Sequence, residues 1–285
     1  MFEVVSLIEE NPNPKQEEFF LNKDMDIRFN NLVVKIGGST LGSGDTTFHD
    51  LVALQDEGVN PIVVHGGGKL IDKWLGQLGV RPKFVDGLRV TDSDTLEVVI
   101  AILTGVVNTS IVSAINQLGG KAVGVSGVHG NIIVGKIDRP ELGLVAGEVN
   151  VNAEMLKTLI DSGIIPVIAP IATNLNDKEQ PCLNANADTV AGAVAIAMQS
   201  KKLIFMTDVE GVYDSSRRLI KKITYNQLNK LIESNVIHGG MIPKLNACLK
   251  VVDNLCAAHI IDGRGSNALK DCLAKTLIGT SIVKK

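Results

Sequence analysis

Short runs of β-branched and aliphatic residues recur along the chain, and most of them end at a glycine. These runs show no alternation of apolar and polar residues, which is typical of parallel strands that are buried on both faces of a sheet. Amphipathic stretches of helical period separate them, and this regular exchange of strand and helix is typical of α/β folds. The pattern predicts strands at 32–38, 61–68, 121–127, 163–172, 201–209 and 257–263, and helices at 48–58, 69–79, 96–119, 153–163, 188–199 and 239–256.

The alternation of strands and helices extends over residues 31–285 and predicts a three-layer αβα sandwich with a mainly parallel central sheet. Residues 1–30 are rich in charge and read as an N-terminal extension, which is either disordered or anchored to a partner. Residues 131–152 carry short alternating runs and turn residues, so we expect a small antiparallel excursion there. Ligands of such folds bind at the carboxyl ends of the strands, where the glycines of this chain lie.

Composition excludes several classes of function. The formal net charge of -3 gives no reason to expect binding to nucleic acid or to a membrane surface. No apolar run approaches the roughly 18 residues that span a bilayer, and the acidic start does not resemble a secretory signal. We therefore expect a cytoplasmic protein with reduced thiols, in which the sequon Asn108-Thr-Ser carries no glycan. The thiols are Cys182, Cys248, Cys256 and Cys272.

Two glycine turns follow predicted strands. In Val33–Ser39 a lysine, Lys35, precedes a glycine pair, and burying a lysine is costly unless it meets an anion. An ordinary lysine that reaches solvent explains Lys35 equally well. In Val63–Gly68 three glycines open a helix and could form an anion-binding nest. The same HGGG pattern occurs in hydrolases, but the required G-x-S-x-G elbow fails at the last position of Gly124–Val128.

Three further segments carry polar groups beside strand or helix ends. Asn184–Asp188 would place its polar side chains on one face if extended, although Asp188 could instead cap a helix that starts at Thr189. Gly239–Lys244 places a lysine in the first turns of a helix, where the dipole favours anions, but a surface lysine is also possible. Thr207–Tyr213 ends a strand with carboxylates that could receive a ribose or a metal, or simply form a turn.

This inventory of glycine turns, two lysines and a carboxylate favours phosphoryl transfer. The sequence contains no Walker A pattern, no Ser-His-Asp set and no obvious cysteine nucleophile. If the acceptor is itself a carboxylate, it is already ionised at pH 7 and needs no general base. Lysines, backbone amides and Mg²⁺ can then supply the stabilisation of charge that the reaction requires.

The motifs VVKIGG, VVHGGG, GLRVTD (within Asp86–Asp92), NANAD, TDVEGVY and GGMIPK, in this order, resemble the amino acid kinase family. They are most similar to the members that phosphorylate the side-chain carboxylate of acetylglutamate in arginine biosynthesis. The resemblance implies a substrate lobe at 31–200 and an ATP lobe at 201–285. It also implies ATP with Mg²⁺ held mainly by the phosphates, no metal site of the protein's own, and a homodimer or a hexamer of dimers.

The resemblance also implies a role for each matching residue. Lys35 and Lys244 would stabilise the transferring phosphoryl group, and Asp188 would hold both lysines. Gly38 and Gly67 would donate backbone hydrogen bonds to that group. Acetylglutamate would be bound by Gly67, Gly68, Arg89 and Asn184, with Asn186 beside them. The nucleotide would be bound by Asp208, Val209, Glu210, Gly211, Val212, Tyr213, Val236, Ile237 and His238.

Departures from the family pattern leave alternatives open. KIGGSTL stands where many members have KYGGSAM, and Lys69 stands where proline is common. The turn Ser126–Gly130 is shared with kinases that act on a carrier-linked aminoadipate in lysine synthesis. A sensor without catalytic activity on the same fold is a third hypothesis, which the presence of both lysines and Asp188 disfavours. The C-terminal stretch differs from that of arginine-inhibited members, so we expect weak or no inhibition by arginine.

Overall fold

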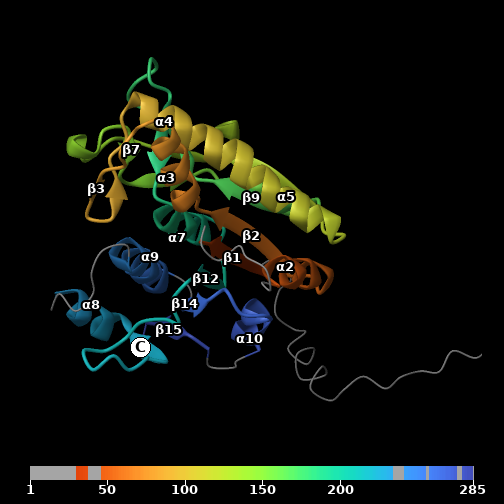
Figure 1. Ribbon diagram of the computed structural model, residues 1–285. Coiled ribbons are helices and arrows are strands. Elements are labelled where there is room, and N and C mark those ends of the chain that lie inside the picture. The colour runs from red at the N-terminus through yellow and green to blue at the C-terminus, as the bar shows by residue number, and fades with distance from the viewer. Residues whose placement is uncertain (1–29, 38–45, 234–240, 255–256, 275–277, 285) are drawn as a thin grey trace, which may run out of the picture.

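The computed structural model describes residues 30–37, 46–233, 241–254, 257–274 and 278–284. Within them the main sheet has eight strands in the order β13-β15-β14-β12-β1-β2-β9-β5 (Figure 1). Neighbouring strands are parallel except for the antiparallel pair β14 and β15, which confirms a mainly parallel sheet. The strands are β1 (Asn31–Ile36), β2 (Asn60–His65), β5 (Ala122–Ser126), β9 (Ile165–Ala169), β12 (Lys202–Thr207), β13 (Lys222–Thr224), β14 (Ala257–Asp262) and β15 (Thr280–Val283).

Helices cover both faces of this sheet, so the predicted three-layer αβα sandwich is confirmed. Successive residues of β1 enter opposite cores: Val33 packs in one hydrophobic cluster and Val34 in the other. One face packs against α6 (Glu154–Asp161), α7 (Ala187–Ala197), α8 (Tyr225–Glu233) and α9 (Met241–Asn254). The other packs against α2 (Thr47–Asp56), α3 (Gly68–Gln77), α10 (Ala268–Leu273) and a long helix composed of α4 (Ser93–Ile100), the π-helical turn η2 (Ala101–Val107) and α5 (Asn108–Gln117).

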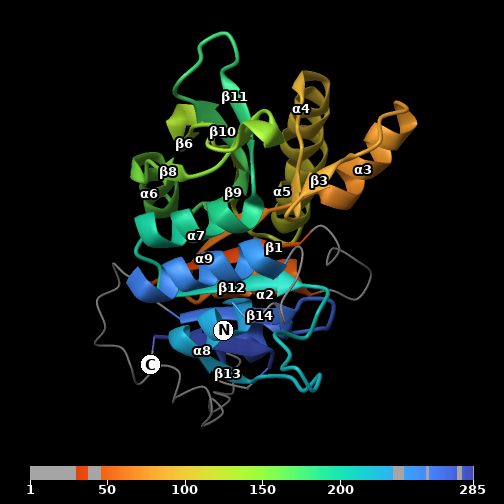
Figure 2. The same ribbon diagram turned by 90° about the vertical axis from the view of Figure 1, so that its left-hand side faces the viewer.

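A second sheet of five strands, in the order β7-β11-β10-β6-β8, stands above the first (Figure 2). The expected antiparallel excursion is present as the pair β6 and β8. The sheet is nevertheless mixed, because β10 pairs in parallel with β6. The predicted strand 163–172 is broken into β9 and β10 at Pro170, which lacks an N–H for the ladder. The additional strands are β6 (Ile133–Gly135), β7 (Val145–Ala146), β8 (Val149–Val151), β10 (Ile171–Asn174) and β11 (Cys182–Ala185), besides the hairpin β3 (Phe84–Val85) and β4 (Leu88–Arg89) and the 3₁₀ turns η3 (His129–Asn131) and η4 (Pro140–Leu142).

The long helix Ser93–Gln117 corrects one expectation from the sequence. Its 25 residues are long and apolar enough to cross a membrane, by length and composition, although no such run was expected. Scattered threonine, serine, asparagine and glycine residues conceal the length of this run in the sequence. Its apolar face, which includes Val99, Ile102 and Ile111, is buried on the main sheet. Packing against the sheet therefore accounts for the buried face, while 39% of the most apolar 18-residue window is buried.

Helices α7 and α9 lie side by side across one face of the sheet (Figure 2). Their close approach depends on Gly192, where an added Cβ would lie 3.2 Å from the Cβ of Ala247. Because α7 carries Asp188 and α9 carries Lys244, the distance between these helices also sets the distance between two candidate site residues.

We expect Gly192→Leu to lower the free energy of unfolding by about 1–3 kcal/mol, because the larger side chain overpacks the contact between the helices. Denaturant unfolding measures the change. The matched control is Gly76→Leu in α3, where nothing lies within 4 Å of an added Cβ. That variant should be neutral or slightly stabilised, since glycine is unfavourable in a helix. Equal stability of the two variants would contradict the proposed role of Gly192.

Candidate active site

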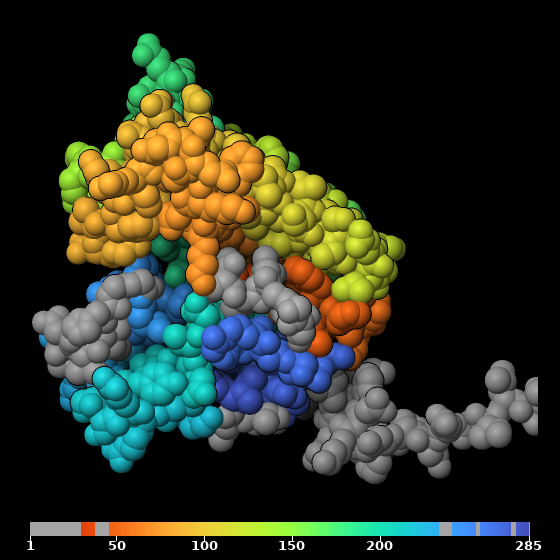
Figure 3. Space-filling model, viewed as in Figure 1, coloured from red at the N-terminus to blue at the C-terminus, as the bar shows by residue number. Residues whose placement is uncertain are grey.

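A cavity of about 410 Å³ opens at the carboxyl ends of β1, β2 and β12. In Figure 3 the surface is hollowed between the orange segment that contains α3 and the blue segment that contains α9. Five separate segments of the chain therefore meet at one place. The cavity is lined by Lys35, Gly37, Gly68, Lys69, Asp188, Met206, Thr207, Asp208, Val209, Met241 and Lys244.

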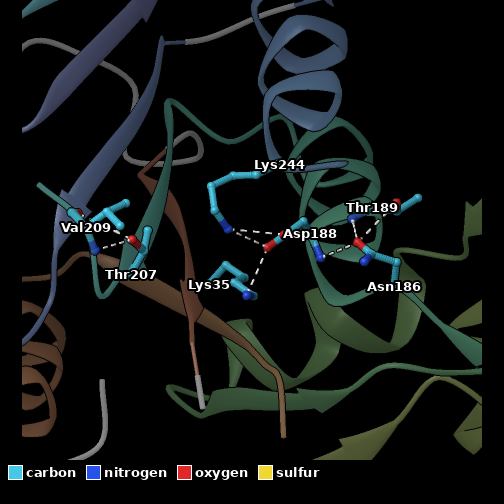
Figure 4. A network of polar contacts seen from close by, with 7 residues as sticks. All are labelled: Lys35, Asn186, Asp188, Thr189, Thr207, Val209 and Lys244. Atoms are coloured by element: carbon cyan, nitrogen blue, oxygen red, sulfur yellow. Dashed lines mark hydrogen bonds and ion pairs between the residues drawn. The ribbon is translucent and has the colours of Figure 1, made fainter. Parts of the chain in front are cut away.

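Two lysines share one carboxylate at the floor of this cavity. The Nζ atom of Lys35 lies 2.9 Å from Oδ1 of Asp188, and the Nζ atom of Lys244 lies 3.1 Å from both carboxylate oxygens (Figure 4). The Lys244 ammonium also lies 5.0 Å from the ring centroid of Phe205, whose electron-rich face favours a cation. All three charged side chains are about nine-tenths buried. The trio carries a net positive charge, which suits an incoming anion.

Burial and mutual charge set the protonation of the trio. Burial by itself raises the pKa of Asp188, but the charges of Lys35 and Lys244 outweigh it and hold that pKa below its ordinary value. Burial lowers the pKa of Lys244, and the nearby charge of Lys35 acts in the same direction, while Asp188 opposes both. The carboxylate is thus ionised at neutral pH and holds two like charges together.

The start of α7 positions Asp188. Oδ1 of Asn186 accepts hydrogen bonds from the backbone N–H groups of Asp188 (2.9 Å) and Thr189 (3.0 Å). Asn186 is therefore the N-cap of a helix that begins at Ala187, and the alternative that Asp188 caps a helix starting at Thr189 is wrong. The extended conformation ends at Ala185, so Asp188 lies within the first helical turn. The helix dipole there adds to the stabilisation of its negative charge.

The second glycine turn lies between β2 and α3. Gly67 is the N-cap of α3, and no side chain caps the first N–H groups of this helix. Packing also requires glycine at position 67, because an added Cβ would lie 2.7 Å from Cδ2 of Leu103 in the π-helical turn. Gly68 lines the cavity, so the positive end of α3 faces it. Gly38 lies outside the described residues.

Arg89 lies beside this turn rather than in the cavity wall. Its Nη1 is 2.7 Å from Oδ1 of Asp72, and its Nη2 donates a long hydrogen bond of 3.5 Å to the carbonyl of Gly68. The contact with Asp72 is close but badly aligned, so both atoms lack a hydrogen-bond partner despite their burial. The guanidinium also lies 4.7 Å from the ring centroid of Phe84. Arg89 thus holds a buried positive charge next to Gly68.

The sequence reasoning missed Asp72 and Thr91. Thr91 Oγ1 donates to the carbonyl of Arg89 (3.0 Å) and accepts from Nδ2 of Asn184 (3.1 Å), and so links these two predicted residues. Thr91 stands two positions after Arg89, on the same face of an extended segment, and this spacing could have revealed it. No signal in the sequence pairs Asp72 with Arg89, because the contact joins α3 to the hairpin.

The predicted nucleotide segment divides between the cavity and the core. Asp208 and Val209 line the cavity, and Val209 N–H donates to Oγ1 of Thr207 at 2.9 Å. Val212 is instead buried in the hydrophobic core. Tyr213 donates through its hydroxyl to Oε2 of Glu210 at 3.0 Å, away from the lining residues. Gly211 fits against Thr280, whereas Val236, Ile237 and His238 lie outside the described residues.

Lys69 bridges the mouth of the cavity. Its Nζ lies 3.9 Å from Oδ2 of Asp208, so the first turn of α3 is in contact with the segment that follows β12. Both side chains are exposed, and such pairs contribute little to stability. Lys69 was noted in the sequence only as a departure from a family pattern, and the structure places its positive charge on the rim of the site.

Comparisons with known proteins agree with this geometry. Residues 30–262 match the amino acid kinase family. The chain belongs to the amino acid kinase family. A protein named acetylglutamate kinase from Cereibacter sphaeroides is 45% identical over 241 residues, which cover 83% of this chain and 82% of that protein. A protein of the same name from Trichodesmium erythraeum is 44% identical over 261 residues, 88% of each chain. The crystal structure of smu.665 from Streptococcus mutans UA159 superposes with a TM-score of 0.78 at 28% identity, over 90% of this chain and 99% of that one.

A kinase of this family needs room and charge for a nucleotide, and the cavity supplies both. The two lysines and the start of α3 would hold phosphates. In the described part of the chain, no group of three or more His, Cys, Asp or Glu side chains could hold a metal ion. Both oxygens of Asp188 are engaged by lysines. These residues therefore fit Mg²⁺ that arrives bound to nucleotide phosphates better than Mg²⁺ held in a protein cage.

We expect Asp188→Asn to lower the free energy of unfolding by about 3–5 kcal/mol at pH 7, because two buried ammonium groups lose their counter-charge. The pKa of Asp188 is lowered in the folded protein, so the carboxylate stabilises it fully above the unfolded pKa of about 4. This stabilisation is lost as the pH falls through the folded pKa. Denaturant unfolding of the wild type and Asp188→Asn should thus differ by a constant amount from pH 7 to about pH 5, and converge only in stronger acid.

The control for this variant is Asp253→Asn, which removes the acid of an exposed pair with Lys284 (3.5 Å). Its loss should be below about 1 kcal/mol, since surface ion pairs contribute little. Similar losses in the two variants would show that Asp188 does not act as the shared counter-charge.

Proposed function

We propose that this chain is an acetylglutamate kinase, which transfers the γ-phosphoryl group of ATP to the side-chain carboxylate of N-acetyl-L-glutamate in arginine biosynthesis. The observation that carries the proposal is the buried trio of Lys35, Asp188 and Lys244 beside the glycine turn that starts α3. The relatives named acetylglutamate kinase, 44–45% identical over most of the chain, support the choice of substrate.

The reaction forms one bond and breaks one. A carboxylate oxygen of the substrate attacks the γ-phosphorus, the bond from that phosphorus to the β,γ-bridging oxygen breaks, and ADP leaves with the electron pair. The products are ADP and an acyl phosphate. Because the attacking carboxylate is already ionised at pH 7, the site needs no general base, and the described cavity wall contains no histidine.

Lys35 and Lys244 act on the charge that develops during transfer. The attacking carboxylate and the phosphates are all anions, so their approach is the main obstacle. Two buried ammonium groups reduce this repulsion, and Asp188 keeps them oriented before the substrates arrive. Mg²⁺ that arrives with the nucleotide phosphates would neutralise further charge beside Lys35 and Lys244.

Arg89 binds the α-carboxylate of acetylglutamate in this proposal. Its guanidinium is buried and lies beside the carbonyl of Gly68, so a carboxylate of the substrate bound at this turn would accept charge-assisted hydrogen bonds from it. Asn184, which is linked through Thr91 to the backbone carbonyl of Arg89, would contact the same substrate. Gly67 and Gly68 would donate backbone hydrogen bonds, and Asn186 serves by capping the helix that carries Asp188.

The nucleotide occupies the side formed by residues 201–285, where Asp208 and Val209 line the cavity. The substrate lobe is 31–200. We further propose a cytoplasmic homodimer, or a hexamer of dimers, that arginine inhibits weakly or not at all. A sigmoidal loss of activity on titration with arginine would contradict the last point.

A hydroxylamine trap tests the activity directly. Acyl phosphates react with hydroxylamine to give hydroxamates, so the enzyme, ATP and Mg²⁺ should produce a hydroxamate from acetylglutamate. Parallel reactions with glutamate and acetylaminoadipate identify the acyl substrate. A product that forms only from acetylaminoadipate would favour the kinase of lysine synthesis. Absence of an ATP-dependent hydroxamate from all three would favour the sensor.

Lys244→Ala tests the assigned mechanism. We expect kcat to fall by at least about 100-fold, because the variant removes a preorganised charge from the transition state. The matched control is Lys250→Ala on the same helix, where the lysine is exposed and lies 3.7 Å from Glu148. This control should retain the activity of the wild type. Full activity of Lys244→Ala would contradict the mechanism.

Arg89→Lys tests the grip on the substrate. Lysine keeps the charge but loses the planar fork that suits a carboxylate, so the KM for acetylglutamate should rise about tenfold or more while the KM for ATP stays the same. Arg218→Lys, at an exposed pair with Asp214, is the control and should change neither constant. An equal rise of both KM values in Arg89→Lys would point to a general distortion of the site instead.

A further inference from the structure

A buried polar contact lies directly behind the glycine turn, and the chemistry described above does not use it. Asn108, the first residue of α5, is 5% exposed, and His65, the last residue of β2, is 0% exposed. Nδ2 of Asn108 lies 3.1 Å from Nε2 of His65 and 2.9 Å from the carbonyl oxygen of Val167 in β9. A buried asparagine thus joins the carboxyl end of β2 to the middle of the neighbouring strand β9.

The chemistry of these partners determines the orientation of the Asn108 amide and the tautomer of the His65 ring. The carbonyl of Val167 can only accept, so the atom that faces it must be the NH₂ group of Asn108. The second hydrogen of this group then points to His65 Nε2, which must be the unprotonated nitrogen of the ring. The proton of the neutral imidazole is therefore on Nδ1, which lies 3.2 Å from the carbonyl oxygen of Gly66 and donates to it.

His65 remains neutral at the pH at which the enzyme works. The pKa of His65 is lowered to about 4, mainly by burial; the hydrogen bond to Gly66 acts in the opposite direction, and the positive charge of Lys35 adds to the lowering. The same tautomer is therefore present throughout the neutral range.

The chain of hydrogen bonds ends on the peptide plane of the catalytic turn. The N–H of Gly66 donates to the carbonyl of Ile36 in β1 at 3.0 Å, and its C=O is held by the His65 ring. In a planar trans peptide the C=O of Gly66 and the N–H of Gly67 point in opposite directions. Fixing the carbonyl of Gly66 therefore fixes the direction of the Gly67 N–H.

We propose that Asn108 is a positioning residue, which acts through His65 to fix the Gly66–Gly67 peptide and thereby aim the Gly67 N–H at the transferring phosphoryl group. The inference rests on the proposed function in one respect, namely that the Gly67 N–H donates to that group. The Asn108-Thr-Ser sequon is not a surface site, because its asparagine is buried between α5 and the main sheet.

Two features of the fold make room for this asparagine. An added Cβ at Gly124 of β5 would lie 1.8 Å from Oδ1 of Asn108, so only glycine at that position admits the carboxamide. The π-helical turn before Asn108 contains wider turns than an α-helix, and both Val107 and Asn108 face the sheet as a result. Such turns often occur at functional sites, and here the turn also packs Leu103 against Gly67.

The kinetic test uses a double-mutant cycle. Asn108→Ala should lower kcat by about 10- to 100-fold with little change in either KM, because a misplaced donor costs catalysis more than binding. Gly124→Ala, on a strand far from the cavity lining, should displace the carboxamide and cause a similar loss. The double variant should be no worse than either single one, since the methyl group added at position 124 then occupies the space that the shortened side chain at position 108 leaves. Additive losses, or a kcat of Asn108→Ala within twofold of wild type, would overturn the proposal.

The matched control is Asn116→Ala, two turns further along α5. Asn116 also makes two hydrogen bonds, with the N–H and C=O of Ala122, but at the opposite end of β5. It should lower Tm without lowering kcat. If the two asparagine variants lose kcat equally, the loss reflects a general weakening of the helix and the proposal fails.

An NMR measurement tests the inference without an assay of enzyme activity. In the wild type, ¹⁵N shifts of the His65 ring should show a protonated Nδ1 and an unprotonated, hydrogen-bonded Nε2. In Asn108→Ala the ring shifts and the amide resonance of Gly67 should move, and in Asn116→Ala they should not. Unchanged resonances in Asn108→Ala would overturn the proposal. Because this result does not depend on acyl phosphate formation, a failure of the proposed function and a failure of the inference can be told apart.

Discussion

Two buried ammonium groups share one carboxylate in this protein, and this arrangement constrains the rest of the structure. Lys35 and Lys244 would repel each other without Asp188, and Asp188 could not be buried as an anion without them. The three side chains come from a strand and two helices, so the sheet and the layer of helices above it must fit closely. Within that helical layer, α7 and α9 approach each other so closely at Gly192 that an added Cβ would lie 3.2 Å from the Cβ of Ala247.

In the proposed mechanism, a second constraint is that the backbone of the glycine turn must be rigid before the substrates arrive. The trio supplies charge, but a turn of three glycines has no side chains of its own to hold its shape. Hydrogen bonds between neutral groups hold the turn on its buried side: Asn108 contacts His65, and His65 contacts the carbonyl of Gly66. Keeping His65 neutral matters because a further positive charge beside Lys35 would add to the repulsion that Asp188 already balances. Charged groups thus face the cavity, and neutral hydrogen bonds stand behind it.

Much of the architecture could be predicted from the order of strands and helices. Largely apolar runs such as 32–36 and 203–206 have the composition of strands buried on both faces, and they form the centre of the main sheet. The glycines that end these runs correctly indicated where the cavity would lie. The positions of the two lysines and Asp188 at strand and helix ends left ordinary surface and capping roles open, and the resemblance to the family selected them. The five-stranded mixed sheet was predicted only in part, because its strands have two to four residues and their pairing depends on segments distant in sequence.

The sequence by itself determined the fold class and the family, because these follow from local pattern and from motifs read in order, and the same motifs named the charged residues proposed for the site. Only the tertiary structure decided how these groups are paired. That Asn186 rather than Asp188 caps α7, that Asp72 lies against Arg89, and that Asn108 reaches His65 all depend on distances between segments far apart in the chain. A buried lysine and a solvated one have the same sequence neighbours, and it is the packing of α9 against α7 that made Lys244 a partner of Asp188.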